Sequence, residues 1–126
     1  MSSIHRFTGE ISEQKYAWEG VEPIEINTDT IHGILKHVLI GPNDGAPNFI
    51  IRYFQVPVGE SSFLHQHPHE HGIVILNGKA KAQINESYYD LEPLSALFIQ
   101  GGDLHQLTNI GDYPLGFICV IPAGAE

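Results

Sequence analysis

Four of the eight histidines in this chain fall within one seven-residue segment, His65-Gln66-His67-Pro68-His69-Glu70-His71. Neutral imidazole is the most common side-chain ligand of first-row transition metals. Residues two apart on a strand point to the same face, so His65 and His67 can bind one ion together. Pro68 cannot donate a ladder hydrogen bond, which predicts a turn there and frees His71 to reach the same ion. The spacing therefore predicts a transition-metal site.

The alternative is a histidine-rich surface loop whose charge varies with pH. An expression tag is excluded, because the segment lies in the middle of the chain between apolar runs. The remaining sequence favours the metal site, because a downstream motif agrees with it.

Composition and length limit the class of protein. With 126 residues the chain fits one domain. Cys119 is the single cysteine, so no intrachain disulfide forms and a reducing compartment is expected. The first ten residues hold no apolar core of signal-peptide length, and no apolar run is long enough to span a membrane. We therefore expect a soluble, cytoplasmic protein.

The charge balance excludes two classes of partner. Fifteen acidic residues against six basic ones give a formal net charge of −9, and the basic residues are scattered. A negative surface repels nucleic acids and anionic membranes, so neither is expected as a partner. Solubility is the simpler role for this acidity.

Short runs of β-branched and aromatic residues alternate with Gly, Pro, Asn and Asp, and helical periodicity is almost absent. Asn77-Gly78 between two apolar runs predicts a hairpin, since both residues tolerate positive φ. This pattern predicts an all-β fold, an antiparallel sandwich or barrel. The predicted strands are Ile31–Ile40, Asn48–Val56, Ser62–His67, Gly72–Asn77, Ala80–Ile84, Tyr88–Leu91, Ala96–Ile99, His105–Asn109 and Leu115–Ile121.

Residues 1 to 30 differ from the rest. Their apolar residues are irregularly spaced, and Pro23 interrupts them. We interpret residues 1–30 as an N-terminal arm that packs on the barrel or on a partner subunit, with residues 31–122 forming the barrel. A loosely ordered tail is the alternative.

Two motifs resemble those of the cupin superfamily. Gly59, His65-x-His67, His71 and Gly78 match the first cupin motif, except that a glutamate usually stands where this chain has His71. The segment Gln100-x-Gly102-x-x-His105-x-x-x-Asn109 is similar to the second motif, with Gln100 in place of a proline. The resemblance implies a single-domain β-barrel of the jelly-roll (double-stranded β-helix) type with a metal at its mouth.

Three further segments resemble small single-domain bacterial cupins with a four-histidine manganese site. They are Val38-Leu39-Ile40-Gly41, Ala46-Pro47-Asn48-Phe49 and Phe117-Ile118-Cys119-Val120-Ile121-Pro122. This resemblance implies one divalent metal per chain, manganese or iron, with nickel or zinc as other occupants after purification. It also implies a homodimer.

Carried over by position, the metal ligands are His65, His67, His71 and His105. His69 falls on a variable position of the motif and is left out of this ligand set. Glu70 precedes the usual acidic ligand position by one residue, so it becomes a ligand only if the register slips.

Four neutral imidazoles leave a divalent ion with two positive charges, which favours binding of anionic ligands. An ion that prefers six ligands keeps two open positions, whereas tetrahedral zinc would form a closed structural site. The leading hypothesis is an enzyme acting on a small organic molecule by dioxygenase-like, oxidative-cleavage or Lewis-acid chemistry. The alternative is a non-catalytic module that binds a metal or small molecule.

Strand alternation and the resemblance suggest walls for the substrate pocket. Leu107 shares a strand face with His105, and Phe117 shares one with Cys119. Arg52 stands within an apolar strand, where it is a candidate to bind a substrate carboxylate. Cys119 is either close to the ion or a buried, inert apolar residue.

Overall fold

The short extended runs fold into nine strands and two turns of 3-10 helix, and the computed structural model describes all residues 1–126. The 3-10 turns are η1 (Ile11–Glu13) and η2 (Pro42–Asp44). The strands are β1 (Ile24–Ile26), β2 (Ile34–Ile40), β3 (Phe49–Val56), β4 (His71–Asn77), β5 (Ala80–Ile84), β6 (Ser87–Leu91), β7 (Ala96–Ile99), β8 (His105–Asn109) and β9 (Leu115–Pro122). None of the helices has the length and apolar composition needed to cross a membrane.

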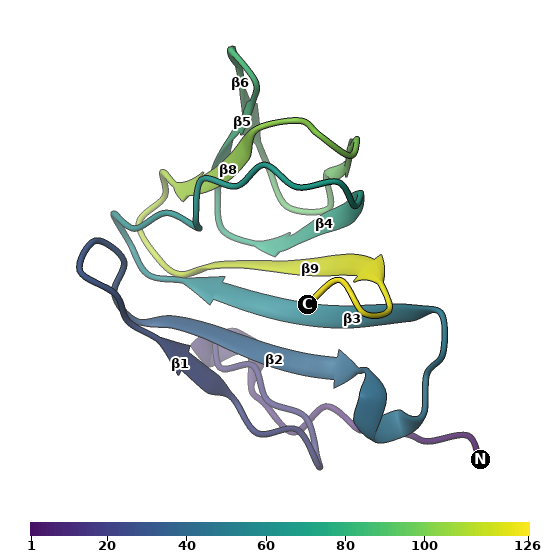
Figure 1. Cartoon of the computed structure of the whole chain (residues 1–126). Coiled ribbons are helices and arrows are strands. Elements are labelled where there is room, and N and C mark those ends of the chain that lie inside the picture. Colours follow the sequence, from purple (N-terminus) through teal and green to yellow (C-terminus); the bar gives the residue numbers. More distant parts are fainter.

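The strands form two antiparallel sheets. The larger has the order β1-β2-β3-β9-β4-β7, and the smaller has the order β6-β5-β8. The broad ribbons of β2, β3 and β9 lie side by side in the larger sheet, and β5, β6 and β8 stand beyond β4 (Figure 1). The tight turn between β4 and β5 uses Gly78, whose φ of 83° suits glycine. The predicted all-β, single-domain jelly-roll fold is confirmed.

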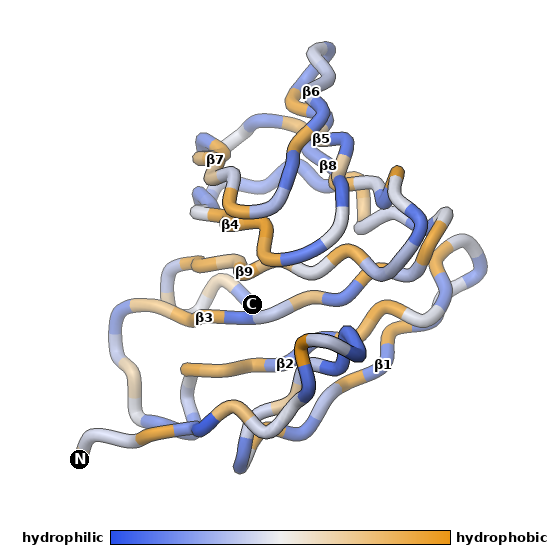
Figure 2. Tube along the Cα trace, turned by 180° about the vertical axis from the view of Figure 1, so that it is seen from behind, coloured by the Kyte–Doolittle hydropathy of each residue, from blue (hydrophilic) through white to orange (hydrophobic).

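The core lies between the inner faces of the two sheets. Hydrophobic and hydrophilic segments follow one another along the tube of the chain (Figure 2), and successive side chains of a strand point to opposite faces. On β9, Phe117, Cys119 and Ile121 are buried while Val120 is exposed, as expected for period-two alternation. The core therefore presents its apolar side chains towards the same interior space as the histidines.

The predicted strand Ser62–His67 is wrong as a continuous strand. Only two isolated bridges form here, Ser61 with Thr108 and His65 with His105. The reason is that the Ser62 hydroxyl, in place of a backbone carbonyl, accepts the Leu107 N–H at 2.9 Å. The segment is thus a loop tied to β8 at two points, a geometry that leaves its histidines free to turn inwards.

The N-terminal arm lies on the outer face of the larger sheet. Phe7, Tyr16 and Trp18 form an aromatic cluster, in which Tyr16 stacks on Tyr53 at 5.0 Å and Trp18 meets His37 edge-on at 5.6 Å. Strand β1, which the sequence did not predict, pairs with β2 at the sheet edge. Within one chain, the arm thus covers the face opposite the histidines.

Candidate metal centre

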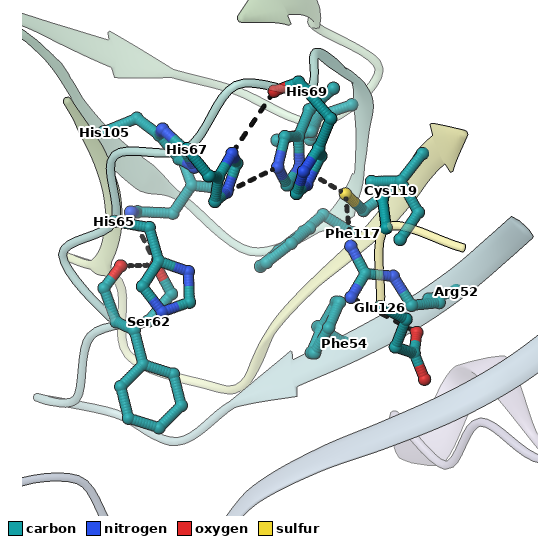
Figure 3. Close-up of a pocket in the computed structure, with 16 residues that line it drawn as sticks. Arg52, Phe54, Ser62, His65, His67, His69, His105, Phe117, Cys119 and Glu126 are labelled. Carbon is teal, nitrogen blue, oxygen red and sulfur yellow. Dashed lines mark hydrogen bonds and ion pairs between the residues drawn. The ribbon is translucent and has the colours of Figure 1, made fainter. Parts of the chain in front are cut away.

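A cavity of about 240 Å³ opens between the sheets and is lined by five histidines (Figure 3). The other polar or sulfur-bearing residues that line it are Arg52, Ser62, Cys119 and Glu126. Its apolar walls consist of Phe54, Phe63, Ile73, Leu107, Phe117, Ile121 and Ala125. A concave site with apolar walls and a few converging polar groups is the usual form of a small-molecule site.

Three parts of the fold bring the histidines together. His71 begins β4 and His105 begins β8, whereas His65, His67 and His69 belong to the loop between β3 and β4. The loop is fixed to β8 because His65 and His105 exchange both backbone hydrogen bonds, at 3.0 and 2.8 Å. The two sequence motifs therefore meet at one end of the barrel.

Hydrogen bonds at the Nδ1 atoms set the orientation of the rings. His67 Nδ1 donates to the carbonyl of His69 at 3.2 Å, and His105 Nδ1 donates to the carbonyl of Asp103 at 2.9 Å. A carbonyl can only accept, so both rings carry their proton on Nδ1 when neutral and keep a lone pair on Nε2. His71 Nδ1 lies 2.9 Å from Cys119 Sγ, which can accept the same kind of bond.

The Nε2 atoms of His67 and His71 are 3.0 Å apart. Two nitrogens in adjacent ligand positions on one ion, each about 2.1 Å from it, are also separated by roughly 3 Å. The His105 ring lies 4.8 Å from the His67 ring and 4.9 Å from the His71 ring. The donor set and its spacing thus fit a divalent transition metal.

The cavity favours neutral histidine. Burial, together with the neighbouring His105 and His67, lowers the pKa of His71 to about 3. Burial likewise lowers the pKa values of His65, His69 and His105. Neutral imidazole is the form that binds metal, so these side chains stay available to an ion at pH values where an exposed histidine is protonated.

One predicted ligand, His65, lies farther from the others, and a fifth histidine, His69, lies beside them. His65 stacks on Phe63, and its ring lies 5.6 Å from that of His67 and 6.4 Å from that of His105. His69, which the motif left out, stacks on His67 at 3.8 Å, and nitrogens of His67, His69 and His71 lie within 4.8 Å of one another. His69 therefore lies in the cavity, which its variable motif position did not indicate.

The other predicted residues take different places. Leu107 and Phe117 are buried in the cavity wall, and Cys119 is 2 % exposed. Arg52 reaches the same space and donates from Nη2 to Cys119 Sγ at 3.2 Å. Glu70 is exposed and lines a separate hollow on the outside of the larger sheet.

One cavity residue had no signal in the sequence. Glu126 lies far along the chain from both motifs, and only the turn after β9 brings it next to Arg52 (Figure 3). No spacing rule connects an isolated glutamate to a strand residue more than seventy positions earlier. Its position became apparent only in three dimensions.

The cupin domain model matches residues 52–121, and the chain therefore belongs to the cupin family. Over 114 residues it is 30% identical to 1-methylthio-D-xylulose 5-phosphate methylsulfurylase of Rhodospirillum rubrum, an alignment covering 88% of this chain and 72% of that protein.

Solved structures support the same fold. A cupin-2 domain protein of Rhodospirillum rubrum superposes with a TM-score of 0.81 at 30% identity, covering 90% of this chain and 76% of that one. A cupin 2 conserved barrel domain protein of Rhodopseudomonas palustris gives a TM-score of 0.78 at 28% identity, covering 98% and 83%. The polyketide cyclase RemF of Streptomyces resistomycificus, at 23% identity and a TM-score of 0.76 over 97% and 79% of the two chains, shares the fold.

Proposed function

We propose that this chain is a metal-dependent cupin enzyme that acts on a small organic molecule. The observation that carries the proposal is the convergence of neutral histidines on an apolar cavity. Backbone carbonyls hold His67 and His105 by Nδ1, so that the proton of each neutral ring is on Nδ1 and the lone pair is on Nε2. A fully enclosed structural site would not need such a cavity beside it.

In this proposal His65, His67, His71 and His105 hold one divalent ion, manganese or iron, and His69 supports the His67 ring. A bound ion would supply Lewis-acid or redox chemistry. Nickel and zinc suit the same ligands, so the metal found after purification can differ from the one used in the cell.

The remaining side chains bind and orient the substrate. Phe54, Leu107 and Phe117 contact its apolar part and exclude water, which strengthens electrostatic interactions inside the cavity. Burial raises the pKa of the Cys119 thiol, so this group stays protonated near neutral pH and is not a ready nucleophile. Arg52 is the single Arg or Lys in the lining and is therefore the cation available to an anionic group.

The Rhodospirillum rubrum relative is an enzyme by its name, which supports catalysis over passive binding. Its substrate, 1-methylthio-D-xylulose 5-phosphate, belongs in any first substrate screen. A non-catalytic module that binds a metal or small molecule is the second candidate, and turnover separates the two.

The first test is elemental analysis of protein purified without nickel affinity, comparing wild type with His71→Ala and His105→Ala. His32→Ala serves as the control, because His32 is exposed and outside the cavity. We expect about one metal ion per chain in the wild type and the control, and loss of the ion in both cavity variants. Circular dichroism before and after chelation should show an unchanged fold.

Two results would contradict the proposal. Equal metal content in all variants would place the ion elsewhere. Unfolding on chelation would identify a structural ion. If metal binds as expected but no substrate in an aerobic screen with Mn²⁺ or Fe²⁺ is converted, the non-catalytic module becomes the better description.

A further inference from the structure

The segment after β9 folds back over the cavity. Gly124, with a φ of 83°, makes the turn, and the Ala123 N–H donates to the carbonyl of Asn48 at 3.1 Å. Ala125 and Glu126 then line the cavity together with the histidines. The side chain of Glu126 lies beside Arg52 on the side of the cavity facing β3 (Figure 3).

Glu126 bridges two cations. Its Oε1 accepts from Lys36 Nζ at 2.9 Å, and its Oε2 lies 3.4 Å from Arg52 Nη1. The shorter contact is with Lys36, so the carboxylate can leave Arg52 and still keep a charged partner. The side chains of Arg52, Lys36 and Glu126 together carry one net positive charge.

Arg52 has a donor group without a hydrogen-bond partner, to which an anion can bind. Its side chain is only 12% exposed, and its Nε is buried without a hydrogen-bond partner. Buried donors are rarely left unpaired in folded proteins, so such a donor indicates a group that the site is built to receive. The guanidinium also lies 4.9 Å from the centre of the Phe54 ring, which holds it in place.

Resting on the function proposed above, we propose that Glu126 occupies the place of the substrate's own carboxylate. The substrate class is then a small monocarboxylic acid with an apolar body. On binding, its carboxylate takes Arg52, while Glu126 moves to Lys36 alone. A monoanion matches the single net charge of this cluster better than a phosphate dianion does, and the apolar walls accommodate the rest of the molecule.

The arrangement also links the acid group to the metal site. Arg52 Nη2 contacts Cys119 Sγ, which in turn contacts His71 Nδ1. A carboxylate on Arg52 is therefore only one side chain away from a proposed metal ligand. The reactive part of the acid would lie a few bonds from its carboxylate.

The test uses benzoate as probe and benzamide as its neutral analogue. Arg6 and Arg52 are the two arginines of the chain, so an Nε–Hε NMR spectrum contains one reporter in the cavity and one exposed control. We expect benzoate, but not benzamide, to shift the Arg52 signal. Glu126→Gln should tighten benzoate binding about fivefold, because it removes the carboxylate that competes with benzoate for Arg52.

Glu92→Gln is the matched control, since it makes the same change in net charge at an exposed pair with Lys79. Its benzoate affinity should equal that of the wild type. Arg52→Gln should abolish the binding, and Arg52→Lys should restore part of it through the retained charge.

Equal tightening in Glu126→Gln and Glu92→Gln would overturn the proposal, because the effect would then reflect overall charge. Binding of benzamide as strong as that of benzoate would overturn it as well. The titration requires neither turnover nor metal and is run on metal-free and Mn²⁺-loaded protein. Its failure is thus distinct from failure of the metal-enzyme proposal, which the elemental analysis tests.

Discussion

At the scale of single residues, the role of each cavity histidine depends on the hydrogen-bond partner of its Nδ1 atom. A backbone carbonyl on Nδ1 fixes both the ring orientation and the proton position of His67 and His105. No side-chain or carbonyl hydrogen bond of this kind orients His65, which instead stacks on Phe63. This difference makes His65 the most adjustable of the four proposed ligands.

The fifth histidine allows a direct comparison between His65 and His69. If His65 is the fourth ligand, His65→Ala should weaken Mn²⁺ binding by at least a hundredfold. His69→Ala should then weaken Mn²⁺ binding only about tenfold, because His69 supports the His67 ring without binding the ion. Calorimetric titration of metal-free protein measures both values.

His32→Ala is again the control and should bind like the wild type. The reverse order, with His69→Ala the more damaging variant, would replace His65 by His69 in the ligand set. Such an outcome would show that the residue spacing of the first motif misassigned one ligand.

At the scale of elements, the sequence predicted the parts whose side chains alternate. All the strands from β2 to β9 were anticipated to within a few residues, because each has an apolar side and ends at a turn residue. The segment Ser62–His67 has a similar composition, but there the Ser62 hydroxyl, and not a backbone carbonyl, accepts the hydrogen bond from the Leu107 N–H. Composition cannot reveal such a side-chain hydrogen bond.

The candidate site was predictable only in part for a related reason. Short-range motifs indicated the histidines, since their spacing is local to two loops. The stacking of His69 on His67 depends on the turn at Pro68, and the contact of Glu126 with Arg52 depends on the turn after β9. Such contacts leave no periodic signal in the chain.

His5 anchors the N-terminal arm through two hydrogen bonds, one to another residue of the arm and one to Asp44 in η2. His5 Nδ1 donates to the carbonyl of Glu19 at 3.0 Å, and Nε2 donates to Asp44 at 2.6 Å. The hydrogen bond to Asp44 raises the pKa of His5. Hydrogen bonds from Ser3, His5 and the Gly41 N–H lower the pKa of Asp44 to about 2.

These shifts define the pH range in which the arm is held. The His5 contribution is fully present below about pH 6.5 and is lost as pH rises through its raised pKa. The Asp44 contribution is present above about pH 4 and is lost as pH falls towards 2. Docking of the arm should therefore be strongest between about pH 4 and pH 6.5 and weaken as the pH rises above this range.

Trp18, the single tryptophan, reports on this docking because it packs on His37 and Tyr53. Acrylamide quenching of its fluorescence should increase between pH 6.5 and 9 in the wild type. In His5→Gln the quenching should be higher throughout and independent of pH. Burial lowers the pKa of His37, so that residue stays neutral in this range. Equal slopes in the two proteins would exclude His5 as the anchor.

At the scale of the whole molecule, one apolar surface remains uncovered by the arm. On the outer face of the larger sheet, Phe98 and Val120 lie on either side of Gly72 in adjacent strands. Phe98 is 62% exposed, and Phe49 and Val74 are also exposed. Because Gly72 has no side chain, the face is hollowed between the flanking apolar groups. A contiguous exposed apolar patch of this kind usually marks an interaction site.

We propose that this face joins two copies of the chain in the expected homodimer. Phe98→Glu would then place a charge in an apolar interface and should convert the dimer to a monomer, halving the mass measured by light scattering. Tyr88→Glu is the control, since Tyr88 is 61% exposed on β6 of the smaller sheet. A wild-type mass equal to one chain would contradict the homodimer, and an unchanged dimer in Phe98→Glu would place its interface elsewhere. Neither substitution contacts the cavity, so metal content should be the same in both variants and would show that each still folds.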